Sequence, residues 1–395
     1  MEFPFFRGNS LLPPAEYAVL RDANPVTRVR LRSGQEAYLV NRYDDLRKLL
    51  SDDRVSVDRR NSGFPVLSES HGVLRQRSLL HMDPPQHATI RRLLAGHFTV
   101  SRVAKLRPQM EAVITRRYQE MLAKDGDAEF VRDFALAVPS ELICLSLGIP
   151  YDERHDFFEE RTAITTSHSV AGEAVTSAED ELRDYVESVV RSRVGSTGDD
   201  VISKLVVAAG TAGVELDEVV SLVHLMLIAG HETSTNALAL SQLLIFDHDE
   251  LVAELSADPG LIPGAIEELL RYTSIVQYQV LRVAVDEIEL GGTVIPEGSP
   301  LIAAVQSANH DPHQFADAGR FDIRRQNASS HVAFGYGIHQ CLGQQFARGE
   351  LRVAFEVMLN MPNRVRSVRP DEVVFKLDSF VFGPRELPVR AVPAR

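Results

Sequence analysis

The ten residues Phe334-Gly335-Tyr336-Gly337-Ile338-His339-Gln340-Cys341-Leu342-Gly343 constrain the structure of this chain more tightly than any other segment. They place three glycines, two aromatic rings and a histidine around Cys341, one of only two cysteines among 395 residues. Glycine lets backbone N–H groups approach a sulfur atom and can take the positive φ values of a tight turn. The helical pattern after Cys341 puts the sulfur at a helix N-terminus, which favours thiolate over thiol. The segment therefore predicts a thiolate ligand, as haem iron requires.

The sequence around Cys341 has two alternative interpretations. An inert buried thiol is the usual state of a free cysteine, and Cys144, in the apolar run 141–147, is typical of that state. A dinucleotide-binding loop needs a third glycine, but Gly335-Tyr336-Gly337 is followed by Ile338, His339 and Gln340. The neighbours of Cys341 favour the ligand interpretation over both.

This segment resembles the ligand loop of the cytochrome P-450 family, the haem-thiolate monooxygenases, whose pattern is Phe-Gly-x-Gly-x-His-x-Cys-x-Gly. All six fixed positions match. Three further motifs occur in the family's order and extend the resemblance over nearly the whole chain. The resemblance implies haem b as cofactor, dioxygen as co-substrate and Cys341 as the metal ligand. It places Phe334, Gly335, His339 and Gly343 against the haem.

The second motif lies within a long helix predicted over 215–246. Ala229 and Gly230 leave space beside this helix, and the Thr233 hydroxyl can compete for the Ala229 carbonyl and open the helix locally. Glu232 adds a carboxylate, and splitting the O–O bond requires protons from such a relay. The segment resembles the family's Ala-Gly-x-Asp/Glu-Thr motif. A kinked core helix with a solvated glutamate is the alternative, and Thr235 excludes a His-Glu-x-x-His zinc site.

The third motif is the pair Glu268 and Arg271, which lie three residues apart on one helical face and can form an ion pair. Such pairs are common on surfaces. The family has a buried pair at this place, joined by an arginine from a later loop, and Arg320 resembles that third member. Ala318 stands where the family has a proline, which bears on the geometry of the loop.

The resemblance also implies partners for the two haem propionates. His87 and Arg91 resemble the family's His-x-x-x-Arg contact, and Arg282 and His339 match two further contacts. A core histidine or an exposed arginine is the alternative for each of the four.

The segments expected around the substrate are largely apolar, which predicts a lipophilic molecule that Gln277 or Tyr278 would orient. They are the loops near 64–80 and 165–172, the helix residues Leu227 and Ile228, the segment 275–280 with Ile275, Val276 and Tyr278, and Phe380 with Val381.

Composition indicates one globular domain over 1–395, because 44% of the residues are apolar, 25% are charged and no linker or repeat divides the chain. We predict a mostly α fold with small peripheral β-sheets and a long central helix, as in cytochrome P-450. The β-rich parts are expected near 27–40, 280–303 and 373–389, and the helical core over 43–272 and 344–360.

Charge and cysteine usage limit the function classes. A net charge of −13 disfavours nucleic-acid binding. The two cysteines give no disulfide framework, the N-terminus lacks a basic leader, and no run of roughly 18 apolar residues occurs. We expect a cytoplasmic monomer without a membrane anchor.

The resemblance implies a monooxygenase that uses dioxygen and two electrons to hydroxylate or epoxidise a lipophilic small molecule, with a secondary metabolite as the expected class. Its electrons would come from a separate ferredoxin or flavodoxin and an NAD(P)H-dependent reductase. A basic docking face on the cysteine side would include Arg92, Arg102, Lys105, Arg116 and Arg348, although ordinary solvated charges explain them equally. A peroxide-driven haem-thiolate enzyme and a non-catalytic haem-binding sensor are the alternatives.

Overall fold

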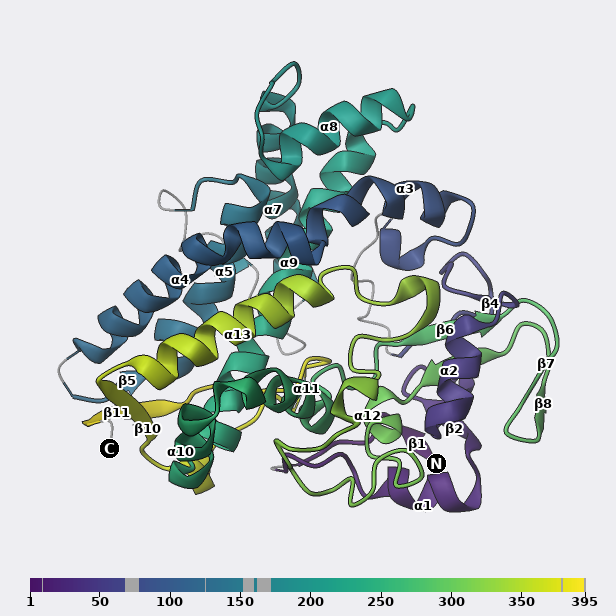
Figure 1. Ribbon diagram of the computed structural model, residues 1–395. Helices are drawn as coiled ribbons and strands as arrows, with labels where there is room; N and C mark the ends of the chain where they lie inside the picture. Colours follow the sequence, from purple (N-terminus) through teal and green to yellow (C-terminus); the bar gives the residue numbers. More distant parts are fainter. Residues whose placement is uncertain are drawn as a thin grey trace.

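The computed structural model describes residues 1–8, 10–67, 78–124, 126–151, 160–161, 172–377 and 379–393. The predicted fold class is confirmed: helices form most of the molecule and small sheets lie at its edges (Figure 1). The described α-helices are α1 (Glu16–Ala23), α2 (Tyr43–Ser51), α3 (Gln86–Ala95), α4 (Val100–Leu122), α5 (Ala137–Leu147), α7 (Gly172–Ser192), α8 (Val201–Thr211), α9 (Leu216–Ser241), α10 (Asp249–Ala257), α11 (Ile262–Thr273), α12 (Val305–Ala308) and α13 (Gln344–Asn360).

The main sheet has the strand order β1-β2-β3-β9-β6-β4. Its strands are β1 (Glu2–Phe3), β2 (Val26–Leu31), β3 (Glu36–Val40), β4 (Val55–Ser56), β6 (Leu281–Ala284) and β9 (Pro300–Ala303). β3 pairs with β9 in parallel, so that Leu39 lies opposite Ile302. This sheet and the hairpin of β7 (Ile288–Leu290) and β8 (Thr293–Ile295) confirm strands in the two regions predicted near 27–40 and 280–303.

The third predicted β-region, 373–389, is mostly wrong. The strand there, β11 (Pro388–Pro393), begins at the end of that range and pairs with β10 (Asn363–Ser367) and β5 (Ala128–Glu129). Before it, Phe375 and Val381 form only isolated bridges, with Pro384 and Val276 respectively. Pro384 has no backbone N–H to extend its bridge, and Val276 lies in a loop rather than in a strand.

The central helix α9 runs through the core and confirms the long helix expected over 215–246 (Figure 1). Its last turn, η4 (Gln242–Phe246), is a π-helix in which the Asp247 N–H donates to the Gln242 carbonyl at 2.8 Å. α9 packs against α5, α7, α8 and α13. The helix therefore brings residues 227–236 to the centre of the molecule.

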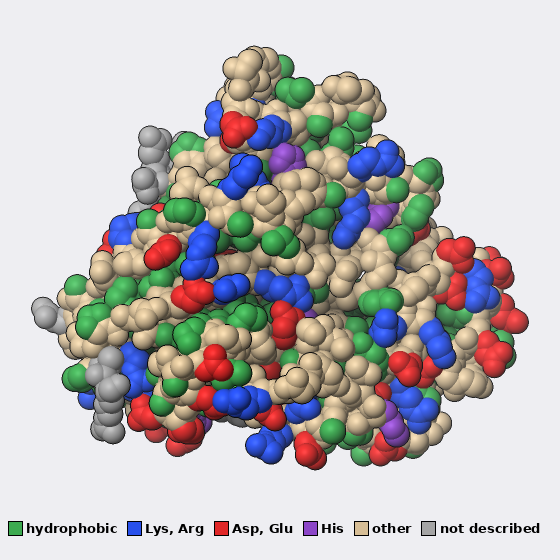
Figure 2. Space-filling view, viewed as in Figure 1, with side chains coloured by type: hydrophobic (Ala, Val, Ile, Leu, Met, Phe, Trp, Pro, Cys, Tyr) green, Lys and Arg blue, Asp and Glu red, His purple; other side chains and the backbone are tan. Residues whose placement is uncertain are grey.

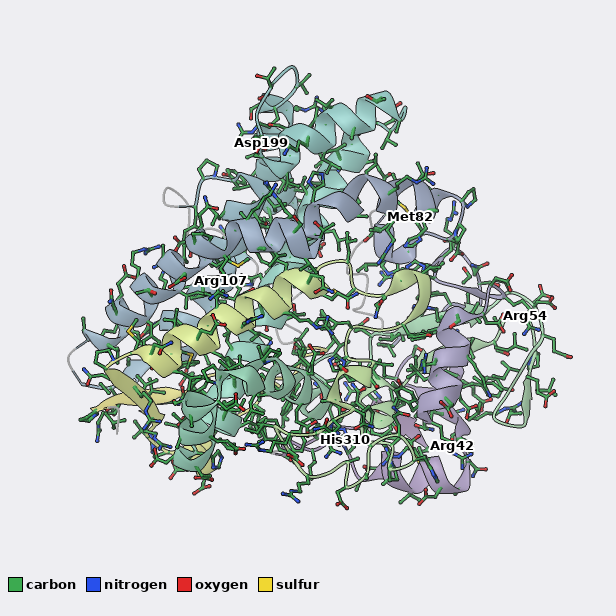
Figure 3. The ribbon with its side chains drawn as sticks, viewed as in Figure 1. Arg42, Arg54, Met82, Arg107, Asp199 and His310 are labelled. Carbon is green, nitrogen blue, oxygen red and sulfur yellow. The ribbon has the colours of Figure 1, made fainter. Side chains whose placement is uncertain are left out.

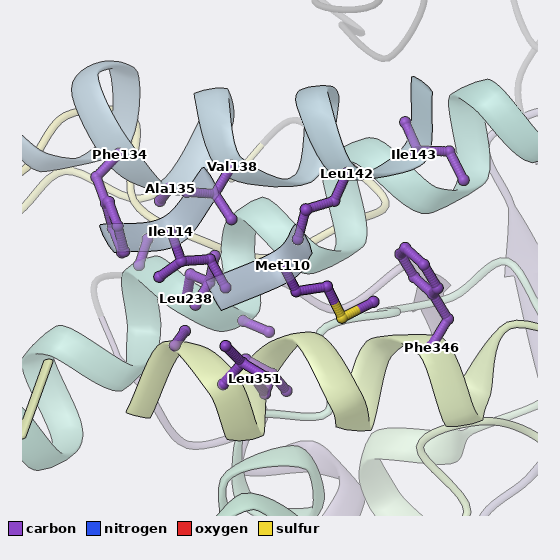
Figure 4. Close-up of a cluster of buried hydrophobic side chains, with 14 of the residues drawn as sticks. Met110, Ile114, Phe134, Ala135, Val138, Leu142, Ile143, Leu238, Phe346 and Leu351 are labelled. Carbon is purple, nitrogen blue, oxygen red and sulfur yellow. The ribbon is translucent and has the colours of Figure 1, made fainter. Parts of the chain in front are cut away.

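Apolar side chains from four helices form the main core (Figure 4). Met110 and Ile114 of α4 face Leu142 of α5, Leu238 of α9 and Leu351 of α13. α4 and α13 approach closely at Gly349, where an added Cβ would lie 2.4 Å from Cγ1 of Val103. Arg107 of α4, labelled in Figure 3, also pairs with Glu356 of α13. These contacts fix α13, and with it the loop that precedes it.

Among the described helices, none combines the length and the apolar composition that crossing a lipid bilayer demands.

Candidate active site

The cysteine loop is closed by two backbone hydrogen bonds. The N–H of Cys341 donates to the Phe334 carbonyl and that of Gly335 to the Val332 carbonyl, each at 2.8 Å. Gly335 and Gly337 have φ values of 71° and 74°, as predicted. A Cβ on Gly337 would lie 2.2 Å from the carbonyl oxygen of Leu50, so this position admits only glycine.

The expectation for Gly343 is wrong in one respect. Its φ is −80°, because it is the N-cap residue of α13 rather than part of the turn. The predicted helix start is confirmed, since α13 begins at Gln344. The backbone N–H groups of Gly343 and Gln344 both lower the pKa of Cys341. Gly343 therefore contributes a donor to the sulfur rather than a left-handed turn.

Cys341 and Cys144 differ as predicted. Cys144 is buried in α5, where burial raises the pKa of its thiol to about 12. Cys341, by contrast, is exposed. Burial by the surrounding atoms raises its pKa, and the two N–H groups and the charges of Arg91 and Arg348 oppose that effect. These donors stabilise a thiolate once a metal adds its own charge.

Part of the middle of α9 is exposed. Ala229 is exposed, and Ile228 and Thr233 are partly exposed, although α9 is otherwise largely buried. The Thr233 hydroxyl donates to the Ala229 carbonyl at 2.8 Å, as predicted. Gly230 differs from expectation, because a Cβ there would lie 3.1 Å from Cδ1 of Ile143 in α5. Gly230 thus allows two helices to approach, and its part in leaving room for oxygen stays a prediction.

Glu232 is held by a partner that the sequence did not indicate. Its Oε1 accepts from Lys376 Nζ at 2.7 Å and from Asn236 Nδ2 at 3.1 Å. Burial raises the pKa of Glu232, but the charge and hydrogen bond of Lys376 outweigh burial, so the pKa lies below its usual value. The carboxylate expected at this position is therefore ionised in an ion pair rather than solvated.

A second buried acid lies one helix away. The Ser234 hydroxyl donates to Glu350 Oε2 at 3.1 Å, linking α9 to α13. Burial raises the pKa of Glu350 to about 8, because this carboxyl group has no cation among its described neighbours. Glu350 is consequently neutral at pH 7 and can donate as well as accept a proton.

The raised pKa of Glu350 predicts a pH-dependent stability. An unfolded glutamate ionises near pH 4.5, whereas folded Glu350 stays protonated until about pH 8. The folded state therefore loses stability relative to the unfolded state as the pH rises between these values, by up to about 1.4 kcal/mol per pH unit. We expect Glu350→Gln to reduce this decline. Urea unfolding at pH 5 and pH 8 would measure it, and equal slopes for parent and variant would contradict the assignment.

Basic and imidazole side chains converge near the cysteine loop. His87 and His339 have ring centroids 4.1 Å apart, and Arg91 donates to the Gln340 carbonyl at 2.7 Å. Burial lowers the pKa of His339 to about 3, and the nearby Arg282, His87, Arg91 and His81 act in the same direction. His81 was missed from the sequence, which offered no motif around it.

Asp58 lies near His81, and Asp83 lies near His87 and Arg282, but neither acid is within ion-pair distance of them. Within the described residues, none of the members of this cluster forms an ion pair with an acid. His81 Nδ1, His87 Nε2 and His339 Nε2 are buried without a hydrogen-bond partner in the described part of the chain. Burial also lowers the pKa of Arg282 to about 10. A ligand with carboxylate groups would satisfy these atoms, which fits the propionates of haem beside Cys341.

The buried pair Glu268 and Arg271 is confirmed, with a bidentate contact of 2.7 and 2.8 Å and no exposure of either side chain. The prediction of Arg320 as the third member is wrong. Arg325 takes that place, with its Nε 3.0 Å from Glu268 Oε2. Arg320 follows Asp317, whose positive φ of 48° turns the chain, and its side chain is exposed. Only the Arg320 carbonyl joins the network, as an acceptor from Arg271 and Arg325.

The predicted substrate-side segments lie in different environments. Leu227 is buried, Ile228 and Phe380 are partly exposed, and Val276 pairs with Val381. Gln277 is engaged with backbone groups, since its Nε2 donates to the Ser379 carbonyl at 2.7 Å. Tyr278 packs edge-on against Phe3 in a core cluster, which does not favour its orienting a substrate. Ile275 is buried. The parts of the two predicted loops at 68–77 and 165–171 lie outside the described residues.

The predicted docking face is partly paired. Arg348 binds Glu267 at 2.6 Å and lies over the Phe334 ring, and Arg116 pairs with Glu120 and Glu141. Arg92 and Lys105 are exposed, and Arg102 is partly exposed. Figure 2 shows basic side chains across the middle of this face and acidic ones along its lower edge and right margin.

Known proteins resemble this chain over nearly its full length. The cytochrome P450 family model matches residues 260–361. The 20-oxo-5-O-mycaminosyltylactone 23-monooxygenase of Streptomyces fradiae is 39% identical, with 98% of this chain and 91% of that protein covered. Pentalenic acid synthase of Streptomyces avermitilis is 39% identical, with 98% and 96% covered. The crystal structure of cytochrome P450 MoxA from Nonomuraea recticatena has a TM-score of 0.92 at 37% identity, with 100% and 99% covered.

Proposed function

Since this chain belongs to the cytochrome P450 family of haem-dependent monooxygenases, we propose that it hydroxylates or epoxidises a lipophilic secondary metabolite with electrons from a separate redox protein. The observation that carries the proposal is the exposed Cys341 just before the start of α13, with the N–H groups of Gly343 and Gln344 directed to its sulfur. The named relatives, which include the macrolide 23-monooxygenase and pentalenic acid synthase described above, support a secondary metabolite as the substrate class.

The cofactor is haem with a cysteine thiolate ligand, and dioxygen is the co-substrate. When bound, haem supplies the reductive activation of dioxygen. We assign Cys341 as its ligand, with the N–H groups of Gly343 and Gln344 directed to the sulfur. We assign the propionate contacts to a cluster in which three buried imidazole nitrogens have no hydrogen-bond partner among the described residues; its members are His81, His87, Arg91, Arg282 and His339.

Besides binding haem, this chain would supply protons to the reaction. Monooxygenation consumes two protons for each oxygen molecule, as one oxygen atom enters the substrate and the other leaves as water. We assign this supply to Glu232 and Thr233 on α9, where the Thr233 hydroxyl donates to the Ala229 carbonyl. Glu350 of α13, which burial holds neutral and which accepts a hydrogen bond from Ser234 of α9, is a further proton donor.

Electrons would enter on the cysteine side of the molecule. Ile338 of the cysteine loop is 52% exposed there, and Arg92, Arg102 and Lys105 carry charges that face solvent at least in part. We propose that an acidic ferredoxin or flavodoxin, reduced by an NAD(P)H-dependent reductase, docks on this face. A cytoplasmic location and a monomeric state stay predictions.

Reconstituted turnover tests the proposal. We expect the holoprotein, a ferredoxin, its reductase and NADPH to convert a member of a polyketide and terpene library to a product heavier by one oxygen atom. Glu232→Gln should lower this rate by roughly a hundredfold, since a positioned acid typically contributes at least that much. Mass spectrometry would follow the product. Turnover only with hydrogen peroxide and none with the ferredoxin system would overturn the proposal in favour of a peroxide-driven enzyme. Ligand binding without oxygen consumption would overturn it in favour of a sensor.

A further inference from the structure

A hairpin near the C-terminus lies directly against the acid of α9. It is formed by 375–377 and 379–384, and the N–H of Lys376 donates to the Gly383 carbonyl at 2.9 Å. The rings of Phe375 and Phe382 stack across it, with centroids 4.9 Å apart. Its contact with α9 is tight, because a Cβ on Gly383 would lie 2.0 Å from Oδ1 of Asn236. The base of the hairpin is thus fixed one helical turn after Glu232.

The far end of this hairpin is anchored as well. The N–H of Gln277 donates to the Phe380 carbonyl at 2.8 Å, and the N–H of Phe382 donates to the Ile275 carbonyl at 2.7 Å. The buried guanidinium of Arg7 lies 4.2 Å from the centre of the Phe382 ring and donates to the Ser274 carbonyl at 2.9 Å. With both ends held, the backbone of Lys376 has a defined place beside α9.

Lys376, Glu232 and Asn236 form a closed set of hydrogen bonds. Lys376 Nζ lies 2.7 Å from Glu232 Oε1 and 3.3 Å from Asn236 Oδ1, and Asn236 Nδ2 donates to the same Glu232 oxygen at 3.1 Å. The Glu232 side chain is 9% exposed and that of Lys376 is 20% exposed. Both donors use Oε1, so that Oε2 has no hydrogen bond within the described part of the chain.

We propose that Lys376 is a positioning residue of the monooxygenase reaction: it holds the Glu232 carboxylate by one oxygen and leaves the other oxygen free to exchange protons with water. This inference rests on the proposed role of Glu232. Protons delivered in time yield product and water from one oxygen molecule and two electrons. The same oxygen, electrons and protons otherwise leave as hydrogen peroxide. Lys376 therefore sets the fraction of electrons that ends in product.

The charged groups around Glu232 support this role. Lys376 from the hairpin is the cation that lowers the pKa of Glu232, and the neighbouring His231 on α9 is buried and held neutral, with a pKa lowered to about 4. Burial acts in the opposite direction on Glu232. Removing Lys376 would leave burial dominant, so that Glu232 would take up a proton near neutral pH and lose its fixed orientation.

The test compares three variants of the holoprotein in the reconstituted system. Lys376→Met removes the charge and keeps much of the side-chain length, and Lys376→Arg retains a cation. Lys124→Met is the matched control, because it removes a lysine that lies 2.8 Å from a buried carboxylate, Asp133, which does not belong to the hydrogen-bonded set of Glu232. We expect Lys376→Met to lower product formed per NADPH by roughly fivefold, since the acid remains and only its placement is lost. Hydrogen peroxide release should rise correspondingly.

Rescue and infrared spectroscopy separate positioning from a structural role. Lys376→Arg should restore most of the coupling, and Lys124→Met should leave it unchanged. In the resting enzyme, the infrared spectrum of Lys376→Met at pH 7 should gain the band of a protonated carboxyl group. Adding Glu232→Gln to this variant should remove that band. Unchanged coupling in Lys376→Met, or absence of that band, would overturn the inference. If Glu232→Gln itself leaves coupling unchanged, the proposed role of Glu232 fails instead.

Discussion

Replacement of Cys341 by serine is expected to abolish monooxygenase activity and to change the colour of the protein. A serine hydroxyl ionises far less readily than a thiol, so the N–H groups of Gly343 and Gln344 would stabilise an anion that does not form. Groups that merely support a metal ligand contribute roughly 10- to 100-fold to activity, and loss of the ligand itself should exceed that range. Product formation in the reconstituted system would measure the loss.

Spectroscopy gives this prediction a second, independent readout. The parent protein, reduced under carbon monoxide, should absorb at the position of thiolate-ligated haem, and Cys341→Ser should not. The control is Cys144→Ala, which removes the other cysteine from the core of α5 and should cost about 1 kcal/mol of stability without altering the spectrum. An imidazole-type spectrum in the undamaged parent would contradict the assignment of Cys341. So would a serine variant with unchanged spectrum and activity.

The parts of the site that lie within one segment could be predicted from the sequence. The cysteine loop and α13 follow from consecutive residues, and the helix indeed spans Gln344–Asn360. The Thr233 hydrogen bond to Ala229 likewise depends on a spacing of four residues within α9. In these cases the backbone geometry of a turn or helix fixes which atoms meet, so that the identity of the residues is sufficient.

The parts that depend on distant contacts could not be predicted. Lys376 lies 144 residues from Glu232, and no local pattern marks either one as the partner of the other. The sequence predicts that Gly230 leaves space beside a cofactor, but a Cβ at this position would meet Ile143 of another helix. Segment 373–389 has the composition of strands, yet before β11 it forms only isolated bridges, one within the segment and one to the loop 275–277. Each of these outcomes depends on which elements pack together.

The third member of the Glu268–Arg271 network also depends on distant contacts, and the two candidate arginines should differ in their effect on stability. Arg325→Leu should reduce haem content and stability strongly, whereas Arg320→Leu should change the free energy of unfolding by no more than about 0.5 kcal/mol. Removing Arg325 leaves the buried Glu268 carboxylate with Arg271 as its cation but takes hydrogen-bond donors from this carboxylate and from three carbonyl groups, and each buried acceptor left without its partner costs about 1–3 kcal/mol. Arg325 binds both oxygens of Glu268, and its other donors reach the carbonyls of Ala316, Asp317 and Arg320.

The expected loss of haem follows from what this network supports. Glu268 also accepts from the N–H of Asp322, so the network holds the loop that follows α12 against α11. The preceding residue of α11, Glu267, binds His331 and Arg348, and Arg348 lies over the ring of Phe334 in the cysteine loop. Haem absorbance per protein and urea midpoints would compare the two leucine variants. Equal haem content and equal urea midpoints in Arg320→Leu and Arg325→Leu would contradict this assignment. Only Arg325 reaches the Glu268 carboxylate, which joins α11 to this loop.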